Sequence, residues 1–298
     1  MPYHLLLPLI GAIVFTLSSM VVKRAFDHGA MAVPVFHHAN YLAAVMFSVL
    51  IFFGQTPVQA SLLYQPAIVA LTIFAGGWFT FGAIRIGDVS LVTPLLGVKV
   101  IVVAAATVLL TGERITPLLW LAAGLAATGI FALSFKDMQK KGARLPALGL
   151  ALLSAVTFGV SDVLLQKWAA GFGPMAFISS MAWAVALYSI IHGVLIRNPV
   201  PKFPLPARKW VWISNTLLAA QGLMMAIALA FFDDATHVNI VYGSRGLWGI
   251  VLVWMLGSKL GLKESNRRSG TMAWRLGGAI LVTAAIVLAV SEQRAAAH

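Results

Sequence analysis

The sequence predicts an all-α membrane protein with ten transmembrane helices, arranged as two inverted five-helix repeats. Three observations predict this fold class: an apolar composition, ten apolar runs of membrane-spanning length, and a correspondence between the two halves of the chain. Hydrophobic residues occupy 60% of the 298 positions and charged residues 10%, and the mean hydropathy is +0.91. These values lie far outside the range of water-soluble globular proteins.

The ten apolar runs follow one another with short connections. A helix needs about 20 apolar residues to cross a bilayer. The predicted spans are residues 5–22, 33–53, 62–84, 89–110, 117–135, 146–166, 174–196, 210–232, 235–256 and 272–291. Charged or turn-rich stretches separate them, and none is long enough to form a soluble domain. The strict alternation of apolar and polar residues that a membrane β-barrel requires is absent.

In the first half, the sequence around each run supports a membrane span. The first run has no basic residue before it and is followed by Lys23 and Arg24, which argues against a cleaved signal peptide. Pro34 stands at the start of the second span and Pro94 within the fourth, where proline can begin or kink a helix. Gly76 and its neighbours in the third span permit close approach of another helix.

In the second half, similar features support the spans. Pro174 begins the seventh span. Trp210 and Trp212 follow two basic residues at the start of the eighth, a pattern typical of a membrane–water interface. The glycines of the ninth span, at positions 243, 246 and 249, favour close helix packing. They are not predicted to be a phosphate-binding loop, because no strand precedes them.

The formal net charge of +12 is distributed asymmetrically between alternate connections. The connections that follow the odd-numbered spans contain most of the basic residues: Lys23, Arg24, Arg85, Lys136, Lys140, Lys141, Arg144, Arg197, Lys202, Arg208, Lys209, Lys259, Lys263, Arg267 and Arg268. The opposite side holds Arg114, Lys167 and Arg294. The positive-inside rule therefore predicts a multi-pass protein of the inner or plasma membrane with both termini extracytoplasmic.

The two halves correspond at a constant offset around the fourth and ninth spans. This offset aligns Gly76 with Gly222, Asp88 with Asp234, Val92 with Val238, Gly97 with Gly243, and Lys99 with Arg245. Each half then contains five spans, within residues 1–140 and 141–298. An odd number of spans inverts the second copy in the membrane, an architecture whose substrate site lies near the midplane between the halves.

Two basic residues lie in the middle of apolar runs, Lys99 in the fourth and Arg245 in the ninth. A bare cation at the bilayer centre costs about 2.5–3.5 kcal/mol even on the translocon scale. Each is about half a span, or ~15 Å, from either surface, too far to reach water along the lipid. We expect no acidic partner at matching depth, because the acids lie at or toward span ends: Asp88, Glu113, Asp162, Asp233 and Asp234. The two cations therefore predict a positive midplane site for a carboxylate or phosphate.

The stretches 87–95 and 109–116 resemble the fourth helix of the drug/metabolite transporter superfamily, particularly its ten-helix EamA-type members. The resemblance rests on Gly-Asp-Val-Ser-Leu-Val-Thr-Pro-Leu followed by Leu-Leu-Thr-Gly-Glu-Arg-Ile-Thr. In the second half, Ile240 replaces the expected proline, and 257–264 is a stretched counterpart of the glycine–glutamate motif. The resemblance implies a metabolite carrier with alternating access, a cavity between spans 1–4 and 6–9, and supporting spans 5 and 10. In the same superfamily, plastid sugar-phosphate translocators hold anionic substrates with basic residues placed similarly to Lys99 and Arg245.

Further candidate substrate-binding residues surround these cations. Tyr242 and Trp248 share the helical face of Arg245, where they would either contact substrate or pack, and Asn239 lies on an adjacent face. The remaining candidates are Trp78, Gln221 and Asp162, together with His37, Asn40 and Tyr41 on one face of the second span. Asp162 follows the polar face Ser154, Thr157 and Ser161, which either lines a cavity or bonds to its own helix.

His37 could also relay a proton and couple transport to the proton gradient, although hydrated histidines are ordinary near a membrane interface.

Together these features predict a secondary active transporter for a small organic anion or zwitterionic metabolite. The alternatives are an amino acid or metabolite exporter without anion selectivity, and an anion channel. The sequence has no intramembrane protease motif and no cysteine, so we expect neither an enzyme nor a metal or other cofactor. The expected partners are the substrate and the lipid bilayer, not nucleic acid, because the basic residues form no single stripe. A monomer is compatible with this function.

Overall fold

Every regular element in the computed structural model is a helix, within the described residues 3–54, 60–86, 96–139, 145–198, 200–256 and 269–296. The first half contains η1 (Tyr3–Leu5), α1 (Leu6–Asp27), α2 (Ala32–Ser48), η2 (Val49–Phe53), η3 (Ala60–Leu62), α3 (Tyr64–Ile86), η4 (Leu96–Val98), α5 (Lys99–Thr111) and α6 (Pro117–Gln139). The second half contains α7 (Leu145–Phe172), α8 (Pro174–Leu195), α9 (Leu205–Phe232), α10 (Ala235–Tyr242), α11 (Arg245–Leu256) and α12 (Ser269–Ala296). The label η marks a short 3-10 helix.

Seven helical segments in the described residues are long and apolar enough to cross a membrane. They lie in α1, α2 with η2, η3 with α3, α7, α8, α9 and α12. The apolar helices Lys99–Thr111 and Pro117–Leu133 are shorter. Large apolar side chains are nevertheless exposed, including Leu109 at 81%, Leu145 at 80% and Leu195 at 76%. Such a surface is unfavourable in water and suits lipid, so the chain is described as a multi-pass membrane protein.

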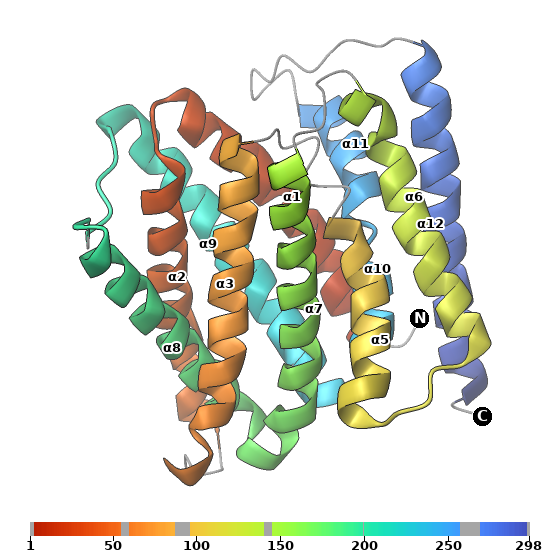
Figure 1. Ribbon diagram of the computed structural model, residues 1–298, viewed down its shortest axis with the longest axis horizontal. Helices are drawn as coiled ribbons and strands as arrows, with labels where there is room; N and C mark the ends of the chain where they lie inside the picture. The colour runs from red at the N-terminus through yellow and green to blue at the C-terminus, as the bar shows by residue number, and fades with distance from the viewer. Residues whose placement is uncertain are drawn as a thin grey trace.

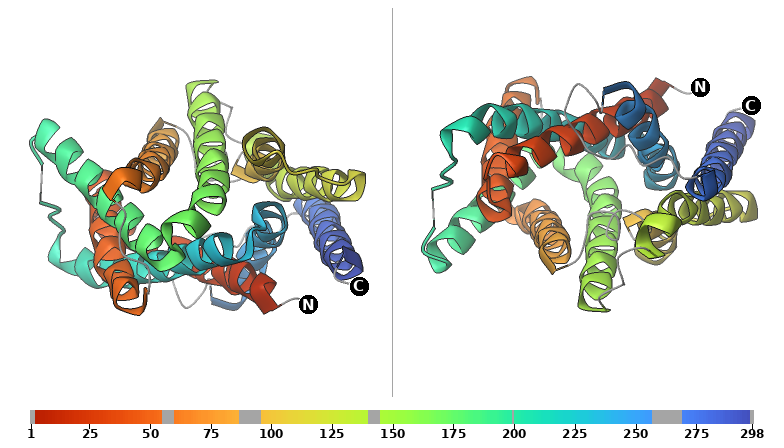
Figure 2. Two further views of the ribbon diagram at one scale, coloured as in Figure 1. Left: turned by 90° about the horizontal axis from the view of Figure 1, so that it is seen from below. Right: turned by 90° about the horizontal axis from the view of Figure 1, so that it is seen from above.

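The helices form one bundle in which segments distant in sequence lie side by side. Helix α1 packs along α9, α3 along α7, and α2 against α8, while α6 and α12 form a pair at one edge (Figures 1 and 2). A Cβ atom added to Gly278 of α12 would lie 2.6 Å from the carbonyl oxygen of Gly129 in α6. This close approach is possible because neither helix has a side chain at the crossing.

The predicted ninth span is interrupted, which corrects the expectation of one continuous helix over 235–256. Helix α10 ends at Tyr242 and α11 begins at Arg245. Between them, the amide of Ser244 donates to the carbonyl of Val241 over 3.0 Å, a turn tighter than an α-helix. Glycine at position 243 has low helix propensity and favours a break at this point.

A similar irregularity precedes the cation of the fourth predicted span. Residues 96–98 form η4, and α5 begins at Lys99, while residues 89–95 of the predicted span lie outside the described residues. A Cβ atom on Gly97 would lie 2.7 Å from Ile130 Cγ2, and one on Gly243 would lie 3.3 Å from Ile130 Cδ1. One side chain of α6 therefore packs against the glycine before each cation.

The first and last helices meet at one end of the bundle. Gln293 Nε2 of α12 lies 2.9 Å from His4 Nε2 of η1, and both chain ends are near this end in Figure 1. The turn between α1 and α2 lies at the opposite end. There, Arg24 of α1 and Lys209 of α9 lie 6.0 and 4.8 Å from the ring centre of Trp210. The N-terminal segment η1 and the C-terminal end of α12 thus lie at the end of the bundle opposite these basic residues.

Candidate functional site

Lys99 is paired with an acid, which corrects the expectation that no carboxylate lies at its depth. Its Nζ lies 2.7 Å from Asp162 Oδ2, and the two side chains are only 12% and 13% exposed. Asn239 Nδ2 also donates to Asp162 Oδ2, over 2.8 Å. The predicted span placed Asp162 near its end at residue 166, whereas α7 continues to Phe172. Ten residues of helix, about 15 Å, therefore separate Asp162 from the end of α7.

The ring of Tyr242 lies close to both predicted cations. Lys99 Nζ is 5.9 Å from its ring centre and Arg245 Cζ is 4.9 Å from it. Tyr242 is 6% exposed and ends α10, and Arg245 begins α11 after the break. Tyr242 and Arg245 thus remain neighbours across the break, as their three-residue spacing predicts. Five predicted residues meet here, and we name them the central cluster: Lys99, Asp162, Asn239, Tyr242 and Arg245.

Three further side chains contact the central cluster, and they were not predicted from the sequence as site residues. Phe15 of α1 lies 5.3 Å from Arg245 Cζ, and Phe158 of α7 lies 5.9 Å from Lys99 Nζ, both distances being to the ring centre. Thr16 Oγ1 donates to the carbonyl of Arg245 over 3.2 Å. Helices α1 and α7 are the first spans of the two predicted repeats, and each supplies a phenylalanine beside a cation. The repeat was the one sequence signal that could have indicated these rings.

The charges of the central cluster suit a ligand with a negative group. Lys99, Arg245 and Asp162 carry a formal charge of +1 together. Each cation is the first residue of an α-helix, Lys99 of α5 and Arg245 of α11. Asp162 pairs with Lys99, and the net positive charge of the three groups attracts a carboxylate or phosphate. Asp162 is also an acceptor for an ammonium group, so the arrangement can hold both ends of a zwitterion.

A second group of predicted residues lies between α2, α3 and α8. His37 Nε2 is 2.9 Å from His192 Nδ1, and the ring of Trp78 is 4.3 Å from that of His192. Tyr41 lies edge-on to His37 at 6.2 Å, and Asn40 donates to Ser189 on α8. These contacts lie near the α1–α2 end of the bundle, separate from the central cluster. No feature of the sequence had indicated His192.

The other predicted residues pack between helices. Gln221 of α9 is 8% exposed, and its Cγ would lie 3.8 Å from a Cβ atom on Gly11 of α1. Trp248 packs against the main apolar core, and its Nε1 is buried with no hydrogen-bond partner among the described residues.

The polar face of the sixth span was expected either to line a cavity or to bond to its own helix, and its residues differ in this respect. Ser154 bonds to Thr80 and to the carbonyl of Gly76 on α3, whereas Thr157 and Ser161 bond to their own helix. Within the described parts of the chain, no three or more His, Asp or Glu side chains are grouped to hold a metal ion. Asp88 lies outside the described residues.

Comparisons with known proteins support the fold and leave the family open. No family model and no curated protein matches the chain. Among solved structures, 29 chains match. One crystal structure of a protein aligns with 97% of this chain and 98% of its own, with a TM-score of 0.73 and 14% sequence identity. At this identity the likeness shows the fold alone, and it extends over the whole length of both chains.

Proposed function

We propose that this protein is a secondary carrier that moves a small organic anion or zwitterion across the membrane by alternating access. The observation that carries the proposal is the central cluster, in which two cations and one carboxylate meet a tyrosine ring inside the bundle. Ionisable groups at membrane depth are expensive and usually serve transport or proton transfer. Arg245 binds the negative group of the substrate. When the substrate enters, the ion pair between Lys99 and Asp162 opens and both side chains contact the substrate instead.

A zwitterion fits this cluster better than a simple anion. Its carboxylate would lie against Arg245 and its ammonium against Asp162, so each charged group of the substrate would meet a group of opposite charge. Tyr242 would contact the body of the substrate, and Asn239 would hold the orientation of Asp162. This chemistry keeps an amino acid exporter as the alternative within the same site. An anion channel is less well supported, because Asp162 would repel a permeating anion.

We propose further that the chain has ten spans in two inverted repeats, residues 1–140 and 141–298, as in EamA-type transporters. The packing of helices supports this arrangement. If the repeats exchange the first span with the sixth and the third with the eighth, then the α1–α9 pair becomes the α3–α7 pair. The same exchange maps α2–α8 and α6–α12 onto themselves. The contact between Gln293 of α12 and His4 of η1 supports an even number of crossings.

The proposed mechanism is based on the break before Arg245 and the 3-10 turn before Lys99. Lys99 and Arg245 start half-helices that belong to opposite halves, and substrate binding between them would connect those halves. Rocking of one half against the other would then expose the central cluster to each side in turn. We place the protein in the inner or plasma membrane with both termini outside, because the basic connections are expected to face the cytoplasm.

The binding step is tested by thermal stability of the detergent-purified protein with propionate, alanine or ethylamine. These probes share a short carbon chain and differ in their charged groups. Ligands that bind the folded state raise the melting temperature. We expect stabilisation by alanine, less by propionate, and none by ethylamine, and we expect Arg245→Gln to lose the carboxylate-dependent part. Equal responses to all three probes would contradict the assignment.

Transport itself is tested by counterflow of labelled alanine in preloaded liposomes. A carrier gives saturable accumulation of label driven by unlabelled substrate inside, whereas a channel gives no such accumulation. Arg114→Gln is the matched control, because it removes one guanidinium from an exposed connection far from the central cluster. Counterflow that is unaffected by Arg245→Gln would place the substrate elsewhere.

A further inference from the structure

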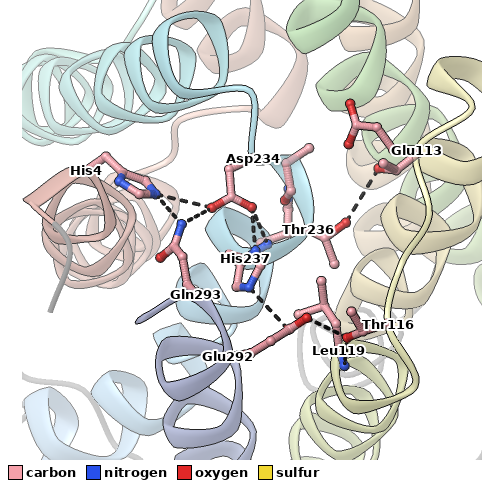
Figure 3. Close-up of polar contacts among 12 residues, drawn as sticks. His4, Glu113, Thr116, Leu119, Asp234, Thr236, His237, Glu292 and Gln293 are labelled. Carbon is pink, nitrogen blue, oxygen red and sulfur yellow. Dashed lines mark hydrogen bonds and ion pairs between the residues drawn. The ribbon is translucent and has the colours of Figure 1, made fainter. Parts of the chain in front are cut away.

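A cluster of histidines and carboxylates lies at the end of the bundle where the chain begins and finishes. His237 Nδ1 is 2.5 Å from Asp234 Oδ1, and its Nε2 is 3.5 Å from Glu292 Oε2 (Figure 3). Asp234 Oδ2 is also 3.2 Å from His4 Nε2 and accepts a hydrogen bond from Gln293. We name these five residues the His237 cluster. Their ionisable side chains are 12% to 16% exposed, so protons can exchange with water.

The His237 cluster connects four separate segments of the fold. His4 belongs to η1, Asp234 caps the start of α10, and His237 lies in the first turn of α10. Glu292 and Gln293 belong to α12, and Glu292 accepts a hydrogen bond from Thr116, which also accepts from the amide of Leu119 at the start of α6. The contacts among these side chains therefore tie η1, α10, α12 and α6 together at one end (Figure 3).

The charges around His237 favour a bound proton. Other charged or titratable groups on the elements packed around it are Asp233 after α9, Glu113 and Arg114 in the α5–α6 connection, and Lys167 of α7. Glu113 accepts from Gln166, and Lys167 donates to the carbonyl of Leu110. The side chains of Glu113 and Lys167 thus bond away from His237. Its nearest charged neighbours are two carboxylates, one at each ring nitrogen.

The contact between His237 and Glu292 depends on this proton. The Nε2 of His237 and the Oε2 of Glu292 are both buried and have no hydrogen-bond partner among the described residues. An imidazolium presents an N–H to each carboxylate, and the attraction draws α12 toward α10. A neutral imidazole has one N–H, so one carboxylate then faces a lone pair and the attraction is lost.

We propose that the His237 cluster is a proton-binding site that closes this end of the bundle, so that the proton is a second ligand of the carrier. Binding of a proton at His237 keeps η1, α6, α10 and α12 together, and its release allows α10 to part from α12. The central cluster has residues on α5, α7, α10 and α11, and it becomes accessible from this end when α10 parts from α12. The inference rests on the proposed carrier function, because such closure matters only if access alternates.

The test uses a single thiol placed next to the His237 cluster, on the side of α5. The sequence has no cysteine, so Thr107→Cys creates a unique label site. Thr107 is 3% exposed, and its Oγ1 is 3.5 Å from that of Thr236, next to His237. The rate of N-ethylmaleimide labelling in liposomes is measured between about pH 5 and 8, where histidine changes charge. The same thiol in a His237→Gln background supplies the reference, so that ionisation of the thiol cancels in the ratio of rates.

We expect the thiol to be labelled more slowly with His237 present than in the His237→Gln background at acidic pH, and the two rates to converge as pH rises. For one linked proton the ratio changes by up to about tenfold per pH unit within the transition. A ratio that stays constant across this range overturns the proposal. The matched control is His28→Gln, at the far end of α1. Adding it should leave unchanged the ratio between the labelling rates with His237 and with His237→Gln.

A second variant covers the case in which His237→Gln does not fold. Glu292→Gln removes one of the two carboxylates, so we expect the change in labelling rate to move to lower pH. An unmoved profile would contradict a role for this contact. Labelling needs no transported substrate, so these results are independent of the probe experiments. A constant ratio rejects the proton site alone, whereas absence of any carboxylate response rejects the substrate class alone.

Discussion

Replacing Lys99 with methionine removes the cation from a pair that is almost entirely shielded from water. Methionine preserves most of the side-chain length, so the substitution changes charge more than volume. Asp162 then remains 13% exposed with Asn239 as a neutral donor. Breaking a buried ion pair by removing one partner costs about 3–5 kcal/mol. We expect the lower end of that range for Lys99→Met, because Asn239 still donates to the carboxylate.

Removing the other partner of the ion pair, Asp162, should lower the free energy of unfolding by more. Asp162→Asn leaves the ammonium of Lys99 buried without its anion and close to the ring that Arg245 also contacts. We therefore expect a loss near the upper end, about 5 kcal/mol. The double variant Lys99→Met/Asp162→Asn contains neither charge, and replacing a whole buried pair is often close to neutral. It should be more stable than either single variant.

The assay is unfolding of the purified protein in mixed detergent micelles, followed by tryptophan fluorescence, for the wild type and the three variants. The diagnostic result is the failure of additivity, since residues in direct contact couple and distant ones do not. Single losses below about 1 kcal/mol that add in the double variant would show a solvated pair. That outcome would refute the argument that Lys99 and Asp162 compensate each other inside the bundle.

Three other expectations follow from the structure. Gly278→Ala should separate α6 from α12 and lower the melting temperature, because its Cβ would lie 2.6 Å from the carbonyl oxygen of Gly129; Gly124→Ala is the control, since nothing lies within 4 Å of a Cβ there. Trp248→Phe should lower the free energy of unfolding only by the lost packing of the indole ring, about 1–3 kcal/mol, because its buried Nε1 has no hydrogen-bond partner in the described residues; a larger loss in the unfolding assay would indicate that this group is paired. A reporter fused to the C-terminus should be active outside the cytoplasm, and a cytoplasmic signal would contradict the orientation.

The helical class of the protein and its principal cations could be predicted from the sequence. Within lipid every backbone polar group must be paired inside its own segment, so a long apolar run has little choice but to form a helix. The cost of burying a charge made Lys99 and Arg245 conspicuous without any structure. The break between Tyr242 and Arg245 was not predicted, because apolar residues continue on both sides of Gly243.

The sequence by itself therefore determined that the chain lies in a lipid bilayer, and it identified the charged residues that need a compensating partner there. Only the tertiary structure decided which residues compensate them. Asp162 reaches the depth of Lys99 because α7 extends to Phe172 and packs against α5, and neither fact can be derived from apolar periodicity. Tyr242 lies near Lys99 for the same kind of reason, since the distance between side chains on different helices is set by how the helices pack.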